Sequence, residues 1–468
     1  MTVHREASTE GAHREASTEN KQRNPLPPTT FMGFLKGMGP GIVVVLSWLG
    51  TGDFISSAVS GSTYGYALIW TLVLAVGSRY FIVSTMSKYQ LCNAVGDRTI
   101  LDGYRRLWKG FPLYIGITTS ILGFVYVSFL LVAAGTALNH LADGLIHLGD
   151  WGTAAWAVVA AAAATCLAFL KRTHYRGLEI LAQLTMAALV VCFLVALIGT
   201  GVDLSAFVKG FAFDLPPGES GYITAVTTAV ALIGAVGGSA ANLLYPYLMH
   251  EKGWRGPEFR RLQRYDLITG TTVMFGLVLA VWVVAAETLH GTGASVDSEQ
   301  GLVLMMERAV GPVGPTLMWL AIFFVVFDNI VTQPRVFVQM LAESIYKSRP
   351  DRLRRLQAKS PDTATEQLHH TDKLFKSVLL FIMLTPVIFS FPFAPDLIVL
   401  TLLGNGLSVV TVPALMVGLV AITMRKDLML PGQANRWWEN LVLAGIGAIG
   451  IWATYELVVA IVGTVSHG

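Results

Sequence analysis

Long runs of apolar residues recur along the chain, and they limit its possible folds more than any other feature. A run of about 20 apolar residues can cross a bilayer as a helix, because a helix satisfies its own backbone hydrogen bonds in lipid. Of the 468 residues, 53% are hydrophobic and 13% are charged, about half the charged share of a soluble domain. The sequence therefore predicts an all-α integral membrane protein with eleven transmembrane helices, at 38–60, 67–87, 112–137, 151–170, 177–200, 221–249, 266–287, 312–344, 374–392, 395–423 and 439–462.

The connections between these runs differ sharply in positive charge. All but four of the 33 Lys and Arg residues lie in the amino-terminal tail or in alternate connections on one side. Lys209 and Arg308 lie on the opposite side, and Arg79 and Arg335 lie within spans. Basic loops stay in the cytoplasm, so we expect a multi-pass protein of the plasma (inner) membrane with a cytoplasmic amino terminus and an extracytoplasmic carboxyl terminus.

The polar segments divide the chain into four parts. Residues 1–34 repeat His-Arg-Glu-Ala-Ser-Thr-Glu and are expected to form a disordered cytoplasmic tail. Residues 35–200 and 201–423 are expected to form two halves of five spans each, and 424–468 holds the last span and the carboxyl terminus. The basic connection 347–376 is interpreted as a linker at anionic headgroups, with a regulatory metal site at its two adjacent histidines as the alternative.

Nothing in the sequence supports an enzyme or a cofactor. Cys92, Cys166 and Cys192 have no metal-ligand spacing, and Walker, Rossmann and zinc-protease motifs are not found. The expected partners are the transported ion or solute and the lipid bilayer, without nucleic acid, and a monomer is compatible with the pattern.

Asp53 is the only formal charge in the first span. A charge at bilayer depth costs roughly 2.5 to 3.5 kcal/mol on insertion scales, so it usually has a partner, a cavity or a passing ion. Asp53 follows Gly50, Thr51 and Gly52, and glycines weaken a helix. We expect this helix to break here and to leave backbone groups available.

The sixth span carries a second glycine-rich interruption. Gly237 and Gly238 precede Ser239, and Asn242 follows one turn later. Interrupted helices in corresponding positions of two halves indicate the binding site of a transporter. We therefore expect Asp53, Gly50, Thr51, Gly238, Ser239 and Asn242 to bind the substrate or ion, with Asp53 and Asn242 as the metal ligands.

The eighth span carries another polar cluster. Asp328, Thr332 and Arg335 recur at helical spacing, so they share one helix face, which we expect to turn inward. A structural ion pair of Asp328 with Arg335 or Arg79 is the first interpretation, and a gating pair or direct substrate contact are alternatives. Arg79 is expected to be a buried counter-ion. In the tenth span, Asn405 is interpreted as a helix-to-helix hydrogen-bonding residue.

Several segments resemble the Nramp family of divalent metal transporters. The resemblance covers roughly residues 35–462 and is carried by Gly39-Pro-Gly41, by Gly65 to Trp70, by Ala137-Leu-Asn139 and by Asn242-Leu. It implies a LeuT-type fold with a 5+5 inverted repeat, broken helices 1 and 6, and a substrate site between them.

The family's functional motifs differ here. Where the family has Asp-Pro-Gly-Asn, this chain has Gly50-Thr-Gly-Asp53, and Met-Pro-His is replaced by Ser239-Ala-Ala241. The third span also lacks the acidic residues that the family uses for protons. A thioether helps to select transition metals, whereas Mg²⁺ is held by one or two carboxylates and retained waters.

We therefore hypothesise a transporter or facilitator of a divalent cation by alternating access, with Mg²⁺ favoured over Mn²⁺ or Fe²⁺. The alternatives are transport of a small amine or polar organic solute, held by Asp53 and by the rings of Trp48, Tyr245 and Tyr247, and a receptor-like relic that transports nothing.

Overall fold

The computed structural model describes residues 48, 51–143, 145–169, 187, 191, 193–213, 215–216, 224–237, 239–359 and 371–467. Every helix or strand element in these residues is helical, and one isolated β-bridge joins Asn93 to Met429. The expected tail, Gly39-Pro-Gly41, Gly50, Gly238, the histidine pair and most of the fifth expected span lie outside the described residues.

Eight helical segments of the described chain are long and apolar enough to cross a membrane. This makes the protein an all-α multi-pass membrane protein, while the count of eleven spans and the inverted repeat stay predictions. The eight segments contain α5 (Ile69–Cys92), α7 (Phe111–Ala142), α8 (Gly152–Phe169), α13 (Arg260–Leu289), α15 (Gly314–Ser348), α17 (Lys373–Leu384) with η6 (Thr385–Ser390), α18 (Leu397–Ser408) with η7 (Val409–Thr411) and α19 (Val412–Thr423), and α20 (Trp437–His467).

Shorter helices occupy the first and sixth expected spans. In the first, the described part is α4 (Thr51–Tyr64). In the sixth, α11 (Ala225–Val236) ends before Gly237, and η3 (Ala240–Leu243) and α12 (Leu244–Glu251) follow. The remaining short helices lie in connections: α6 (Ile100–Leu107), η1 (Gly149–Trp151), α10 (Leu204–Lys209), η4 (Pro257–Phe259), α14 (Glu299–Val310) and α16 (Pro350–Lys359).

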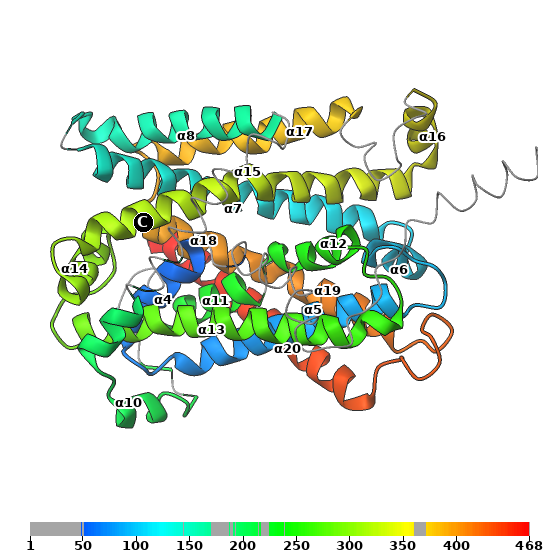
Figure 1. The fold of residues 1–468 in the computed structure, drawn as a ribbon, viewed down its shortest axis with the longest axis horizontal. Coiled ribbons are helices and arrows are strands. Elements are labelled where there is room, and N and C mark those ends of the chain that lie inside the picture. The colour runs from blue at the N-terminus through cyan, green and yellow to red at the C-terminus, as the bar shows by residue number, and fades with distance from the viewer. Residues whose placement is uncertain are drawn as a thin grey trace, which may run out of the picture.

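The helices pack in layers around the short pieces. Figure 1 shows α8 beside α17 at the top, α15 and α7 together below them, and α4, α11, α13 and α5 lower down. The long α15 packs along α7, α13 packs along α4, and α11 packs against α18. The short helices α4 and α11 are thus enclosed by longer ones, which places the helix ends that matter for function inside the bundle.

At one end of the bundle, backbone hydrogen bonds join the end of α5 to the segment before α20. Ala94 N donates to Leu428 O (2.8 Å), and Leu430 N donates to Cys92 O (2.9 Å). A salt bridge of 2.8 Å between Lys88 and Glu439 joins the two helices themselves. The last turn of α5 is therefore held in place both by backbone hydrogen bonds and by a side-chain salt bridge.

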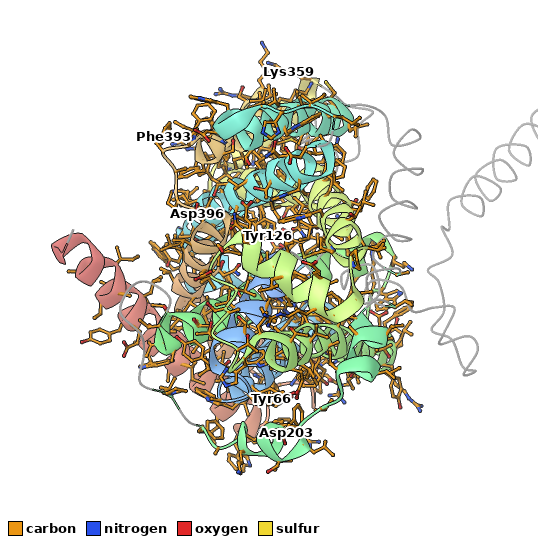
Figure 2. The ribbon with its side chains drawn as sticks, turned by 90° about the vertical axis from the view of Figure 1, so that its left-hand side faces the viewer. Tyr66, Tyr126, Asp203, Lys359, Phe393 and Asp396 are labelled. Atoms are coloured by element: carbon orange, nitrogen blue, oxygen red, sulfur yellow. The ribbon has the colours of Figure 1, made fainter. Side chains whose placement is uncertain are left out.

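At another edge of the bundle, Glu287 of α13 binds two connecting segments. Its Oε1 accepts hydrogen bonds from Tyr66 Oη (2.7 Å) and from Asp203 N (2.9 Å). Figure 2 shows Tyr66 and Asp203 near one another there, and Tyr126 within the body of the bundle.

Candidate functional site

The first candidate side chain lies in the first turn of α4. Asp53 belongs to the first turn of that helix and is 3% exposed. The amino-terminal end of a helix carries partial positive charge, which stabilises a carboxylate. Thr51 is the first described residue of α4, but its side chain is outside the described residues, as is Gly50. The expected site residues of the first span are therefore represented by Asp53.

The second functional element is the carboxyl-terminal end of α11. The last carbonyl groups of a helix have no partner within it, and here side chains from elsewhere bind them. Arg79 donates from Nε to Val236 O (2.6 Å) and from Nη2 to Ala235 O (2.9 Å). Asn242 Nδ2 donates to Gly237 O (2.9 Å) and to Val236 O (3.2 Å). The interruption in the sixth span is thus a polar junction.

Arg79 reaches this junction from the middle of α5 and is 0% exposed. Its guanidinium carbon lies 4.8 Å from the centroid of the Trp48 ring, and Nη1 donates to the thioether of Met274 on α13. Asp53 and Tyr126 lie within electrostatic range of it. The structure therefore places a buried positive charge within electrostatic range of a buried carboxylate, and the role of Arg79 as its counter-ion stays a prediction.

Asn242 supplies a buried acceptor at the same place. The residue is 3% exposed, and its Oδ1 accepts no hydrogen bond from the described residues. A buried acceptor left without a donor costs roughly 1 to 3 kcal/mol, so a ligand that satisfies it gains that much. Ser239 is half-buried, and its carbonyl accepts a hydrogen bond from Asn242 N (3.0 Å). Gly238 lies outside the described residues.

Asn405 of α18 locks α4 and α11 against each other. Its Nδ2 donates to Ser56 Oγ on α4 (3.0 Å), the helix-to-helix bond that the sequence predicts. A Cβ atom on Gly52 would lie 2.6 Å from Asn405 Oδ1, and one on Gly234 would lie 2.0 Å from Asn405 O. The glycines therefore permit three helices to meet where a larger residue would separate them.

The polar cluster of the eighth span lies on a partly buried face of α15 (Gly314–Ser348). Asp328, Thr332 and Arg335 are half-buried, and Thr332 Oγ1 donates to Asp328 O (2.9 Å). Within the same stretch of α15, the fully buried polar residues are Asn329 and Gln333, at 0% and 1% exposure. Each lies one position after Asp328 or Thr332, and successive side chains on a helix are about 100° apart around its axis.

Asp328 and Arg335 were chosen from the sequence because they are charged. The apolar residues that flank Asn329 and Gln333 are the pattern that indicates the buried face of α15. The hydrogen bonds of Arg79 go to α11 and α13. A gating pair that includes Asp328 and Arg335 stays a prediction.

Two carboxylates near the junction were not singled out from the sequence. Asp266 Oδ2 accepts from Tyr245 Oη (2.8 Å), and Glu343 Oε2 accepts from Tyr247 Oη (2.9 Å). Each lies near the end of its span, where a carboxylate is usually explained by headgroup water. Two tyrosines spaced i, i+2 in a helix point to different sides, and this was the available hint that each has its own partner.

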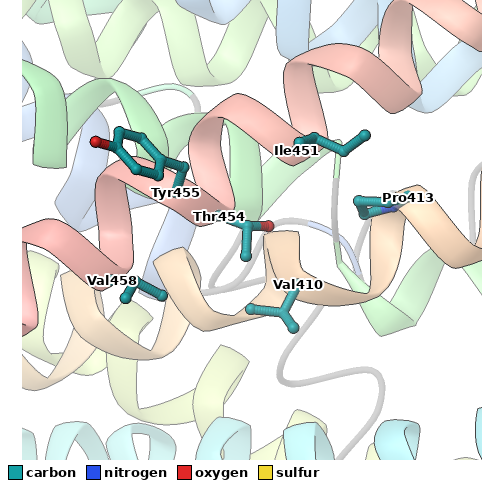
Figure 3. A pocket seen from close by; sticks show the side chains of 6 residues that line it. All are labelled: Val410, Pro413, Ile451, Thr454, Tyr455 and Val458. Carbon is teal, nitrogen blue, oxygen red and sulfur yellow. The ribbon is translucent and has the colours of Figure 1, made fainter.

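Metal-ligand clusters and cavities add little to this picture. In the part of the chain that the structure describes, no three His, Cys, Asp or Glu side chains gather as they would around a metal. A groove of about 320 Å³ lies between η7 and α20 (Figure 3). Its lining is mostly apolar and includes none of the residues above: Val410, Pro413, Ile451, Thr454, Tyr455 and Val458.

Comparison with known proteins identifies relatives of this chain. Over 278 residues the chain is 25% identical to the divalent metal cation transporter MntH of Bradyrhizobium diazoefficiens. The matched residues make up 56% of this chain and 57% of that protein. The crystal structure of the Eremococcus coleocola manganese transporter has a TM-score of 0.64 and 14% identity, covering 94% of this chain and 90% of that one. MhsT in complex with L-phenylalanine has a TM-score of 0.52 and 15% identity, covering 93% and 99%.

These structural likenesses support the LeuT-type transporter fold. The family model described as natural resistance-associated macrophage protein-like matches residues 41–460. Since this match covers most of the 468 residues, the chain belongs to the Nramp family.

Proposed function

We propose that this protein is a secondary transporter or facilitator of a divalent metal cation, and not an enzyme. The family membership supports this, as does the name of its Bradyrhizobium relative, a divalent metal cation transporter. The observation that carries the proposal is that Arg79 lies within electrostatic range of the buried Asp53 and shares the Val236 carbonyl at the end of α11 with the Asn242 amide. Asp53 and Asn242 are the proposed metal ligands, and Gly50, Thr51, Gly238 and Ser239 complete the proposed site.

The donor atoms favour a hard cation over a soft one. Asp53 and Asn242 offer oxygen atoms, as do the carbonyl groups at the end of α11. Mg²⁺ prefers oxygen ligands and retains some of its water, whereas sulfur ligands favour transition metals. We therefore propose a preference for Mg²⁺ over Mn²⁺, in contrast to the manganese transporter of similar fold.

Alternating access is the proposed mechanism. α4, α11 and α12 are short and end at the site, whereas α7, α8, α15 and α17 pack on one another as a separate layer. Movement of the short helices against this layer would open the site to either side in turn. A divalent ion that crosses about 100 mV gains roughly 4.6 kcal/mol, twice the value for one charge, so uptake needs no coupled ion.

An amine-bearing solute is the weaker candidate. The guanidinium of Arg79 covers one face of Trp48, and the Tyr245 ring stacks on Trp48 with centroids 6.4 Å apart. Tyr247 is hydrogen-bonded to Glu343. Arg79 thus takes the cation-binding ring face that an amine needs.

The proposed setting is the plasma membrane, with eleven spans, a cytoplasmic amino terminus and an extracytoplasmic carboxyl terminus. The charge asymmetry of the connections supports this orientation. The same reasoning supports the four-part division at residues 34, 200 and 423.

Uptake into liposomes tests the function. We expect Asp53→Asn to reduce Mg²⁺ and Mn²⁺ uptake at least tenfold while the protein stays folded, because the substitution removes the charge and keeps the shape. Asp297→Asn, which changes an exposed carboxylate in a connection, is the matched control and should transport like the wild type. Unchanged uptake by Asp53→Asn would remove Asp53 from the mechanism, and stabilisation by organic amines alone would favour the alternative.

A further inference from the structure

The position of Arg79 raises a question about the site itself. Its guanidinium is fully buried and donates to two carbonyl groups at the end of α11 and to a thioether on α13. The carboxyl-terminal end of a helix carries partial negative charge and attracts cations. The groups that would attract a transported cation are therefore already bound to a cation that belongs to the chain.

We propose that Arg79 is a tethered competitor of the transported metal. It occupies the cation position at the end of α11 when no metal is bound, and a divalent ion binds by displacing it. The inference rests on the proposed function, since it deepens the account of the same substrate site.

Electrostatics gives the reason that the two cations exclude each other. Arg79 lies within electrostatic range of Asp53, so the pair carries little net charge while the guanidinium stays in place. A metal ion bound by Asp53 would then face a neighbouring positive charge in a low-dielectric interior, which is repulsive. When the guanidinium leaves, Asp53 regains its full attraction for the metal.

Displacement also changes the ligands that the site offers. Arg79 binds Ala235 O, Val236 O and Met274 Sδ, and its departure would release all three. Arg79 thus controls access to the site, because a divalent ion reaches these three ligand atoms only after it has displaced the guanidinium.

Metal binding by Arg79→Gln tests the proposal. We expect isothermal titration to show at least tenfold tighter binding of both Mn²⁺ and Mg²⁺ than in the wild type, because neither ion then has to displace a guanidinium. Arg79→Lys keeps the positive charge and should bind both ions about as the wild type does. Lys88→Gln is the matched control, since it removes a buried charge from the same helix about 13.5 Å further along, and its affinities should not change.

Chemical rescue gives an independent readout. Arg79→Ala removes the side chain, so millimolar guanidinium chloride should raise its melting temperature and compete with Mn²⁺, while an equal concentration of sodium chloride should not. The wild type should show neither effect. The measurement on Arg79→Ala also tests the proposal if Arg79→Gln folds poorly, because added guanidinium restores the missing group.

The outcomes separate the two proposals. Wild-type affinity for both metals in Arg79→Gln, without guanidinium rescue of Arg79→Ala, would overturn the inference and leave Arg79 as a structural cap of α11. If no variant binds a divalent ion while guanidinium still stabilises Arg79→Ala, the proposed metal transport fails and the cation position at α11 stands. Tighter metal binding that Asp53→Asn abolishes in the Arg79→Gln background would support both.

Discussion

At the scale of single residues, the site pairs each buried charge with the helix end of opposite sign. Asp53 lies in the first turn of α4, and Arg79 binds the last carbonyl groups of α11. Each charge therefore offsets part of its own desolvation with a helix dipole. This arrangement lets a bilayer-spanning protein keep two ionised groups in its interior.

Asn242 has two roles that substitution separates. Asn242→Ser removes the donor to Val236 O and Gly237 O and shortens the acceptor. We expect Mg²⁺ and Mn²⁺ to bind about tenfold more weakly, or about 1.4 kcal/mol. Asn242→Asp keeps the acceptor and adds a charge, so it should bind divalent ions more tightly. Equal affinities of all three proteins by titration would show that Asn242 only caps α11.

At the scale of helices, the site depends on how closely α18 approaches α4 and α11. The backbone carbonyl of Asn405 lies too close to Gly234 to leave room for a Cβ there. The side chain of Asn405 likewise leaves no room for a Cβ on Gly52. Backbone atoms cannot move away as the end of a side chain can. The three helices therefore keep a fixed spacing around Asp53.

Gly234→Ala tests this spacing. We expect the extra methyl group to destabilise the protein by about 1 to 3 kcal/mol, because it overpacks a helix contact. Gly77→Ala is the matched control, since a Cβ at Gly77 of α5 would meet nothing within 4 Å. It should be neutral or stabilising by up to about 1 kcal/mol. Equal thermal unfolding of the two variants would contradict the close approach.

Sequence periodicity predicted helices well but not their partners. Gly237 to Ser239 indicated the interruption between α11 and η3, because local glycine content weakens a helix. The bonds of Arg79 to α11 join residues 156 and 157 positions apart, and no local pattern carries that information. The face that α15 buries depends on its packing against α7, and this too is information that no local pattern carries.

At the scale of the whole molecule, ion pairs in the connections hold the helix ends together. Asp372 precedes α17 and accepts hydrogen bonds from Arg352 Nη2 (2.9 Å), Leu374 N (3.0 Å) and Tyr346 Oη (2.9 Å). Burial raises the pKa of Asp372, but these donors outweigh it and hold the pKa below its usual value. The pKa of Asp102 on α6 is lowered in the same way: burial raises it, but Lys347 and the backbone N–H groups of Thr99 and Arg98 together bring it below its usual value.

These lowered pKa values predict acid sensitivity. A carboxylate with a lowered folded-state pKa stabilises the protein fully above its unfolded pKa, about 3.9 for Asp, and loses that contribution as the pH falls through the folded value. We expect a steady melting temperature from pH 7 to about pH 5 and a decline below about pH 4. Asp372→Asn should melt lower at pH 7, because a neutral amide loses the charge-assisted hydrogen bond from Arg352, and it should decline less in acid. A parallel decline in both proteins would exclude Asp372 as a cause.

The hydrogen bonds between the end of α5 and the segment before α20 set a limit on the substrate site. Because Cys92 and Lys88 are held by Leu430 and Glu439, the main chain that carries Arg79 has little room to travel. The guanidinium can then leave the α11 carbonyl groups by torsion about its own aliphatic side chain, without a shift of the packed helix. Exchange of one positive ion for another at this place would accordingly leave the α5 backbone where it is.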